Sequence, residues 1–132
     1  MIIISNENKY GHCKRGKYDV NGTEIFFRSE WEYKYAMYLD FLKRKKQIVC
    51  WEYEPCTFFF EAIKQGTRSY LPDFRITNND KSQEYHEIKG YMDSKSKTKL
   101  NRMKKYYPCE KVILIDGPAY KSIMRYENVY GI

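Results

Sequence analysis

The stretch over residues 70–90 constrains the fold of this chain more than any other. It reads YLPDFRITNNDKSQEYHEIKG, two runs of strand-forming residues joined by a polar turn at residues 78–81. Antiparallel pairing through this turn predicts a hairpin, with Asp73 on the first strand and Glu87 and Lys89 on the second. Pro72 cannot donate a hydrogen bond to the ladder, which favours an edge or bulged position beside Asp73.

The alternation of side chains along the two strands separates a charged face from an apolar one. The charged face would carry Asp73, Arg75, Glu87 and Lys89. The apolar face would carry Phe74, Ile76 and Ile88. We therefore expect the apolar side to be core and the charged side to be a functional site.

Two carboxylates that converge on one spot repel each other and favour a hard divalent cation, which takes oxygen ligands. Such an ion can polarise a phosphodiester oxygen and lower the pKa of a bound water. The ammonium of Lys89 is then suited to orient that water or to stabilise negative charge on phosphorus. An exposed hairpin with a cross-strand ion pair is the alternative interpretation of Asp73, Glu87 and Lys89.

The composition indicates one domain over residues 1–132 that attracts polyanions. The net charge is +7, from 24 Lys and Arg against 17 Asp and Glu, and such a field favours nucleic acid. The four cysteines have no Cys-x-x-Cys spacing, so we expect reduced thiols, no zinc site and a cytoplasmic protein. The apolar run at residues 2–4 is too short for a membrane span, and no membrane partner is expected.

The N-terminal third predicts an arm, a hairpin and a helix. Residues 5–17 are polar and basic, and we expect a mobile arm over residues 1–17 that is either solvated or laid on a phosphate backbone through Lys14 and Arg15. Asn21-Gly22 lies between strand-like runs and predicts a tight hairpin. A helix is expected to begin at Ser29, because Ser29-x-x-Glu32 fits a capping box before residues with helical periodicity.

Two carboxylates of this helix compete for a place at the site. Glu32 and Glu30 lie at opposite borders of its apolar face, and periodicity does not choose between them. The capping box alone would account for Glu32, at about 1 kcal/mol of helix stability.

Further elements complete the pattern. Strands are expected at residues 48–53 and 57–63, a strand buried on both faces at 111–116, and a short helix at 119–127. A basic helix is expected after residue 93 and before Pro108. Its cations have no acidic residues between them and suggest an external anion. With Arg75, Lys14 and Arg15, the expected DNA-binding residues are therefore Lys95, Lys97, Lys99, Arg102, Lys104 and Lys105.

Pro72-Asp73, followed after thirteen residues by Glu87-Ile88-Lys89, resembles the signature of the PD-(D/E)XK nuclease superfamily. The element order is similar to its restriction-endonuclease-like core, a mixed sheet flanked by helices with the acidic site at one sheet edge. The resemblance implies Mg²⁺, with Mn²⁺ able to substitute. It selects Glu32 as the helix carboxylate, which would act with the catalytic residues Asp73, Glu87 and Lys89. The implied metal ligands are Asp73, Glu87, Glu32 and Ile88.

The resemblance also implies a substrate and a partner. Small phage-encoded members of the superfamily include Holliday junction resolvases, which are homodimers that cut both strands of a four-way junction. We therefore expect a structure-specific endonuclease that acts on branched DNA in recombination, in the host cytoplasm if the chain is phage-encoded. A nonspecific or replication-linked nickase is the alternative, followed by a restriction or transposon-end nuclease. A nucleic-acid-binding module without catalysis is the alternative from another class.

Overall fold

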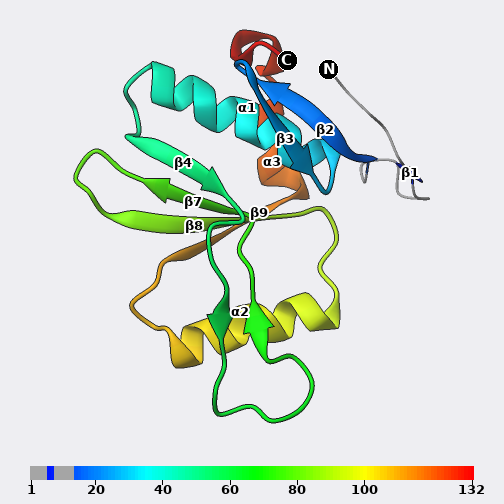
Figure 1. The fold of residues 1–132 in the computed structure, drawn as a ribbon, viewed down its shortest axis with the longest axis vertical. Coiled ribbons are helices and arrows are strands. Elements are labelled where there is room, and N and C mark those ends of the chain that lie inside the picture. The colour runs from blue at the N-terminus through cyan, green and yellow to red at the C-terminus, as the bar shows by residue number, and fades with distance from the viewer. Residues whose placement is uncertain (1–5, 8–13) are drawn as a thin grey trace.

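A four-stranded mixed β-sheet lies at the centre of the protein, with helices on both of its faces (Figure 1). The computed structural model describes residues 6–7 and 14–132. β4 and β8 both pair antiparallel with β7, and β9 runs parallel to β8. The predicted α/β architecture with a mixed sheet is confirmed. In the sheet order β4-β7-β8-β9, the strands span Cys50–Tyr53, Phe74–Thr77, Gln83–Lys89 and Val112–Asp116.

The β7–β8 hairpin has the predicted turn and the predicted faces. The turn closes through a hydrogen bond from the Asn78 amide to the Ser82 carbonyl oxygen at 2.8 Å. Phe74 and Ile76 are buried at 0% and 2% exposure, and Ile88 of β8 is buried with them. The apolar face of the hairpin is therefore core, as expected.

Asp73 lies just outside the strand that was predicted to contain it. β7 begins at Phe74, and Asp73 lies in a bend immediately before it. The reason is that Pro72 lacks an amide hydrogen and that the preceding strand pairs elsewhere, so the ladder starts only after the proline. Asp73 still joins the ladder through its carbonyl oxygen, which accepts from the Glu54 amide at 2.7 Å.

One face of the sheet packs against α1 (Glu30–Arg44) and α3 (Gly117–Met124), and the 3₁₀ helix η1 (Glu127–Tyr130) packs on α1 through the ring of Tyr130. The predicted start of α1 is confirmed, because Ser29 Oγ accepts from the Glu32 amide at 3.1 Å. Tyr35 and Leu39 of α1 are each 1% exposed, so this face forms the larger of the two cores.

The hairpin of β2 (Lys14–Val20) and β3 (Thr23–Phe27) covers the same side as α1. Asn21 and Gly22 have φ angles of 47° and 90°, the left-handed backbone that the predicted tight turn requires. Residues 14–17 belong to β2, so the prediction of a mobile arm is wrong for them. β2 also pairs with β1 (Asn6–Glu7), and the rest of the predicted arm, with Cys13, lies outside the described residues.

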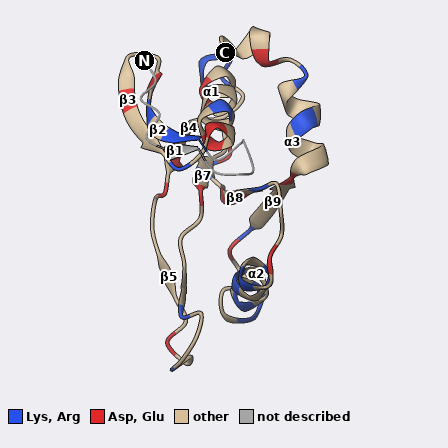
Figure 2. Ribbon diagram, turned by 90° about the vertical axis from the view of Figure 1, so that its right-hand side faces the viewer, with Lys and Arg blue, Asp and Glu red and all other residues tan. Residues whose placement is uncertain are grey.

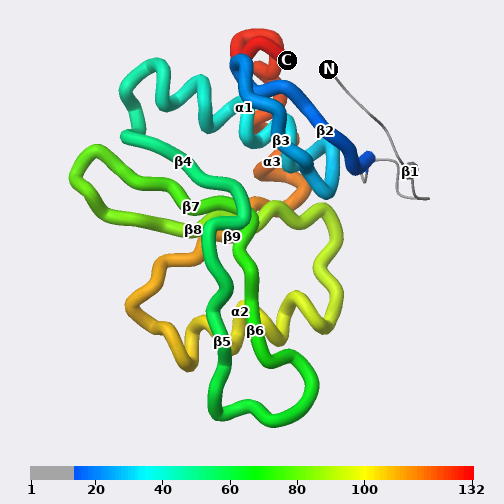
Figure 3. The backbone as a smooth tube through the Cα atoms, in the orientation of Figure 1, coloured from blue at the N-terminus to red at the C-terminus, as the bar shows by residue number. Residues whose placement is uncertain are grey.

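The opposite face packs against α2 (Ser94–Tyr106) and a second hairpin, β5 (Phe58–Phe59) with β6 (Ser69–Tyr70). α2 begins as predicted, with the Asp93 carboxylate accepting from the Ser96 amide at 2.7 Å. β5 is much shorter than the strand expected at residues 57–63. Figure 3 shows the two arms of this hairpin running down beside α2 and beyond it.

β9 is an edge strand, and of its five residues only Ile115 is fully buried, which corrects the prediction that it is buried on both faces. The crossover through α2 brings β9 to the outer side of β8, and within the described residues no strand pairs beyond it. Leu114 is consequently 38% exposed. Cys50, Cys56 and Cys109 are free thiols. Within residues 6–7 and 14–132, no helix has the length and apolar character needed to cross a bilayer.

Candidate active site

Three carboxylates predicted from the sequence meet where β7 begins and β8 ends. Asp73 immediately precedes β7, Glu87 is in β8, and Glu32 lies in the first turn of α1. Asp73 Oδ2 accepts a hydrogen bond from the Ile88 amide at 2.8 Å, which ties it to the Glu87 strand. Burial, followed by the charges of Glu87 and Glu32, raises the pKa of Asp73. The three side chains are therefore close enough to repel one another.

Glu32 is held at the site by Tyr53. The Tyr53 hydroxyl donates to Glu32 Oε1 at 2.5 Å. Burial and the charges of Glu54 and Glu87 nevertheless raise the pKa of Glu32 to about 7, because they outweigh the hydrogen bonds that favour its ionised form. Without a cation, this carboxyl group is therefore partly protonated at neutral pH.

Glu32, and not Glu30, is the helix carboxylate beside Asp73. The charge of Glu30 raises the pKa values of Tyr18 and Tyr120, which belong to the core on the α1 side. The two residues are two helix positions apart, which separates them by about 200° around the axis, so only one of them faces the site.

Glu87 is held by a second tyrosine on the α2 side of the sheet. The Tyr70 hydroxyl donates to Glu87 Oε1 at 2.7 Å. Burial raises the pKa of Glu87, and the positive charges of Lys89 and Lys99 oppose the rise. A cavity of about 50 Å³ lies beside this carboxylate and is lined by Tyr70, Leu71, Glu87, Lys89, Ser96, Lys99 and Leu100.

Tyr53 and Tyr70 are site residues that the sequence did not reveal. With fourteen tyrosines in the chain, no spacing distinguishes these two from tyrosines of the core. The positions of Tyr53 and Tyr70 depend on how β4 and β6 pair with other strands, and local sequence patterns do not predict that pairing. Lys99 was expected to bind DNA, and the fold additionally brings it next to Glu87.

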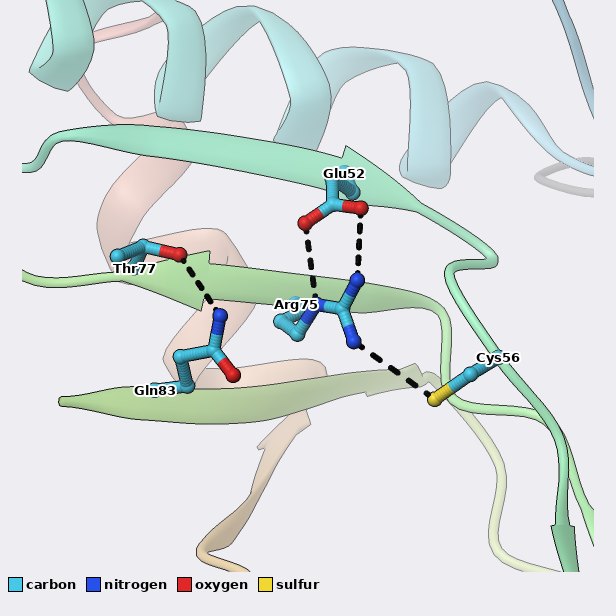
Figure 4. A network of polar contacts seen from close by, with 5 residues as sticks. All are labelled: Glu52, Cys56, Arg75, Thr77 and Gln83. Carbon is cyan, nitrogen blue, oxygen red and sulfur yellow. Dashed lines mark hydrogen bonds and ion pairs between the residues drawn. The ribbon is translucent and has the colours of Figure 1, made fainter. Parts of the chain in front are cut away.

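Arg75 shares a sheet face with Glu87 but has its own partner. Its guanidinium makes a bidentate contact with Glu52, with nitrogen–oxygen distances of 3.0 and 2.8 Å (Figure 4). A third nitrogen lies 4.0 Å from the Cys56 sulfur. Arg75 therefore forms a cross-strand ion pair rather than a free contact for phosphate.

The remaining predicted cations divide between two sides of the protein. The ribbon of α2 is coloured for Lys and Arg along much of its length in Figure 2, and the side chains of Lys95, Lys97, Lys104 and Lys105 are exposed. Arg102 is half-buried and donates a hydrogen bond to the Thr67 carbonyl oxygen, so it connects α2 to the β5–β6 hairpin. Lys14 and Arg15 lie in β2, on the α1 side of the sheet.

The chemistry of the three carboxylates fits a hard divalent cation, because burial and repulsion disfavour their ionised forms and a cation would reverse this. Across the described part of the chain, no group of three or more His, Cys, Asp or Glu side chains is arranged as a preformed ion site. Glu32, Asp73 and Glu87 each direct one oxygen to a protein donor instead. The main-chain carbonyl of Ile88 is the only metal-binding group that this residue offers.

Comparison with known proteins adds no assignment to this geometry. No protein-family model matches the chain, and no curated protein matches it.

Proposed function

We propose that this protein is a metal-dependent DNA endonuclease of the PD-(D/E)XK type that hydrolyses phosphodiester bonds. The observation that carries the proposal is the electrostatic coupling of Glu32, Asp73 and Glu87 at one end of the central strands, with Lys89 beside them. Burial raises the pKa of all three carboxylates, and the neighbouring charges raise those of Asp73 and Glu32 further, so the cluster costs stability instead of adding to it. Perturbed groups of this kind, beside a cavity, are typical of catalytic sites.

Mg²⁺ is the proposed cofactor, with Mn²⁺ as a substitute, and Asp73, Glu87, Glu32 and the Ile88 carbonyl would hold it. A bound ion of this kind supplies Lewis-acid polarisation of the phosphate and a more acidic water. The protein positions the carboxylates: Tyr53 donates to Glu32, Tyr70 donates to Glu87, and the Ile88 amide donates to Asp73. Such second contacts orient ligands for a metal.

Lys89 is the proposed electrophilic group. It leaves the same sheet face as Glu87, and both line the small cavity beside Tyr70. An ammonium at this position can orient the attacking water or stabilise the negative charge that develops on phosphorus. Lys99 lines the same cavity from α2 and adds a second positive charge for the phosphate.

Branched DNA, with the four-way junction as the leading case, is the proposed substrate, and a homodimer is the proposed active form. The basic residues of α2 are suited to contacts with DNA phosphates, and such contacts can recognise the shape of the DNA backbone. A single small domain offers few side chains for reading a long base sequence. Two copies would present two sites to the two strands cut at a junction.

The test is cleavage of four-way junction, flap, nicked and linear DNA side by side, with Mg²⁺ or Mn²⁺ and with EDTA as the control. We expect metal-dependent cleavage that is fastest on the junction. Asp73→Asn and Glu87→Gln should each abolish cleavage and leave DNA binding equal or tighter, because a repulsive charge is lost. Equal rates on linear DNA would favour the nickase, and binding without cleavage of any substrate would favour the non-catalytic module.

A further inference from the structure

A second cavity, of about 270 Å³, lies between the β5–β6 hairpin and the first turns of α2. Its walls come from two segments that are distant in the sequence, the hairpin loop and the helix. Three of the six lining residues are cationic and none is acidic: they are Gly66, Thr67, Arg68, Ser69, Lys95 and Lys99.

The cations of this cavity are available to a ligand. Among the described residues, the side chains of Arg68 and Lys95 have no hydrogen-bond or ion-pair partner, and both residues are exposed. Most other arginines of the described chain have a partner, as Arg75 has Glu52 and Arg28 has Glu54. Two unpaired cations that face one cavity repel each other, and an anion placed between them removes this cost.

The second cavity and the cavity beside Glu87 share one lining residue, Lys99. Lys99 lines both the 270 Å³ cavity and the 50 Å³ cavity beside Glu87 and Lys89. A chain of positive charge therefore runs from Arg68 and Lys95 past Lys99 to Lys89. This arrangement matches a polymer with regularly repeated negative charges better than a single small anion.

The hairpin that forms one wall is held against α2 by three contacts. Phe60 and Met103 are buried together in the smaller core. The Tyr107 hydroxyl donates to the Phe59 carbonyl oxygen at 2.7 Å, and Arg102 donates to the Thr67 carbonyl oxygen. Since these contacts do not involve the side chains of Arg68 or Lys95, the cavity is formed before any ligand binds.

We propose that this cleft, defined by Arg68, Lys95 and Lys99, binds a phosphate of the DNA strand next to the phosphate that is cut. The inference rests on the proposed nuclease function, because it takes the ligand to be the same strand. Arg68 makes a forked contact with phosphate oxygens, and Lys95 and Lys99 add point charges. The cleft thereby positions the strand along the line from the hairpin loop to Glu87.

The test measures binding of a labelled four-way junction in EDTA, so that the result does not depend on cleavage. Arg68→Ala and Lys95→Ala should each weaken binding about five- to tenfold at about 0.1 M salt and lower the salt slope by roughly one contact. Lys121→Ala is the matched control, since it removes an exposed cation of α3 on the opposite side of the sheet. Thermal unfolding of each variant checks that the fold is unchanged.

A neutral phosphate then locates the contact. A methylphosphonate is placed at one position of the strand at a time, and binding is compared between the wild type and the Arg68→Ala/Lys95→Ala double variant. We expect one position, adjacent to the cut site, where neutralisation weakens binding of the wild type but not of the double variant.

The outcomes separate this proposal from the nuclease proposal. If Arg68→Ala and Lys95→Ala bind no more weakly than Lys121→Ala while the wild type still cuts DNA, the cleft proposal fails and the nuclease proposal stands. If the two variants lose binding as expected but no DNA form is cut with Mg²⁺ or Mn²⁺, the cleft binds DNA in a protein that is not a nuclease. If neutralisation has its effect at every position equally, the cleft has no specific phosphate and the proposal is overturned.

Discussion

Ionisation of Glu32 opposes the stability of the folded chain. Its pKa rises from 4.5 to about 7, chiefly because it is buried and also because Glu54 and Glu87 are negative. Between these two pH values the folded protein binds more protons than the unfolded chain, so stability falls as the pH rises. His86 makes stability rise with pH, the opposite effect, because burial lowers its pKa in the folded protein.

Glu32→Gln should therefore stabilise the metal-free protein at pH 8 but change little at pH 4.5. Gln cannot ionise, so the variant loses the penalty that the wild type acquires through this range, while the His86 contribution is common to both proteins. Melting temperatures in EDTA from pH 4.5 to 8 measure the difference. Addition of Mg²⁺ at pH 8 should raise the melting temperature of the wild type more than that of the variant. Parallel curves for the two proteins would show that Glu32 does not titrate in this range.

Lys89→Ala tests whether Lys89 takes part in the reaction or only adds positive charge that binds DNA. Lys89 lies against the carboxylates Asp73 and Glu87, which offset its charge, so its removal should change overall affinity for DNA much less than removal of an exposed α2 lysine. If Lys89 acts on the water or on phosphorus, its loss costs about 3 kcal/mol of transition-state stabilisation, or about a hundredfold in rate. Single-turnover cleavage at saturating enzyme measures this, and a variant that cuts normally once bound would exclude Lys89 from the reaction.

The helix α2 and the strand β8 have different proposed roles: α2 binds the DNA substrate, and β8 carries residues of the reaction. β8 carries Glu87 and Lys89 in a rigid central strand, whereas α2 presents its lysines along an exposed helix face. Lys97 and Lys104 are both exposed, and neither lines the cavity beside Glu87. Phosphate contacts from α2 should thus determine how much DNA is bound and not how fast bound DNA is cut.

Lys97→Ala and Lys104→Ala should each weaken binding and lower the salt slope by roughly one contact, with little change in the rate of saturated enzyme. Arg102→Ala should behave differently, because this side chain holds the β5–β6 hairpin through Thr67. Its loss should also lower the melting temperature. Equilibrium binding as a function of salt, with single-turnover rates, distinguishes the two effects. A large fall in the cleavage rate of Lys97→Ala at saturating enzyme would indicate that this part of α2 takes part in catalysis.

Across the whole molecule, the described residues bring Glu32, Asp73 and Glu87 together at one place, so the proposed cutting of two strands would use a second copy of the chain. A proposed homodimer should sediment at about twice the 16.1 kDa of the chain. On a supercoiled plasmid with an extruded cruciform, coordinated cutting by a dimer should yield linear DNA with little nicked circle. Accumulation of nicked circles by a monomeric protein would contradict the dimer and favour the nickase.

The sequence by itself determined the β7–β8 hairpin, the start of α1 at Ser29 and the start of α2 after Asp93. Each depends on local interactions: strand alternation, turn residues and helix caps act within a few residues of one another. The same alternation identified which side of the hairpin is apolar. Asp73, Glu87 and Lys89 could be proposed because their spacing lies within this one hairpin.

Only the tertiary structure decided which further residues join them. Glu32 rather than Glu30 faces Asp73 because of how α1 packs on the sheet, and Tyr53 and Tyr70 reach the site because β4 and β6 end beside it. Arg75 pairs with Glu52 because the register of β4 against β7 places the two residues opposite each other. Arg68 lies near Lys99 because the β5–β6 hairpin packs on α2. These are contacts between distant segments, whose geometry is set by burial of the two cores and not by any local pattern.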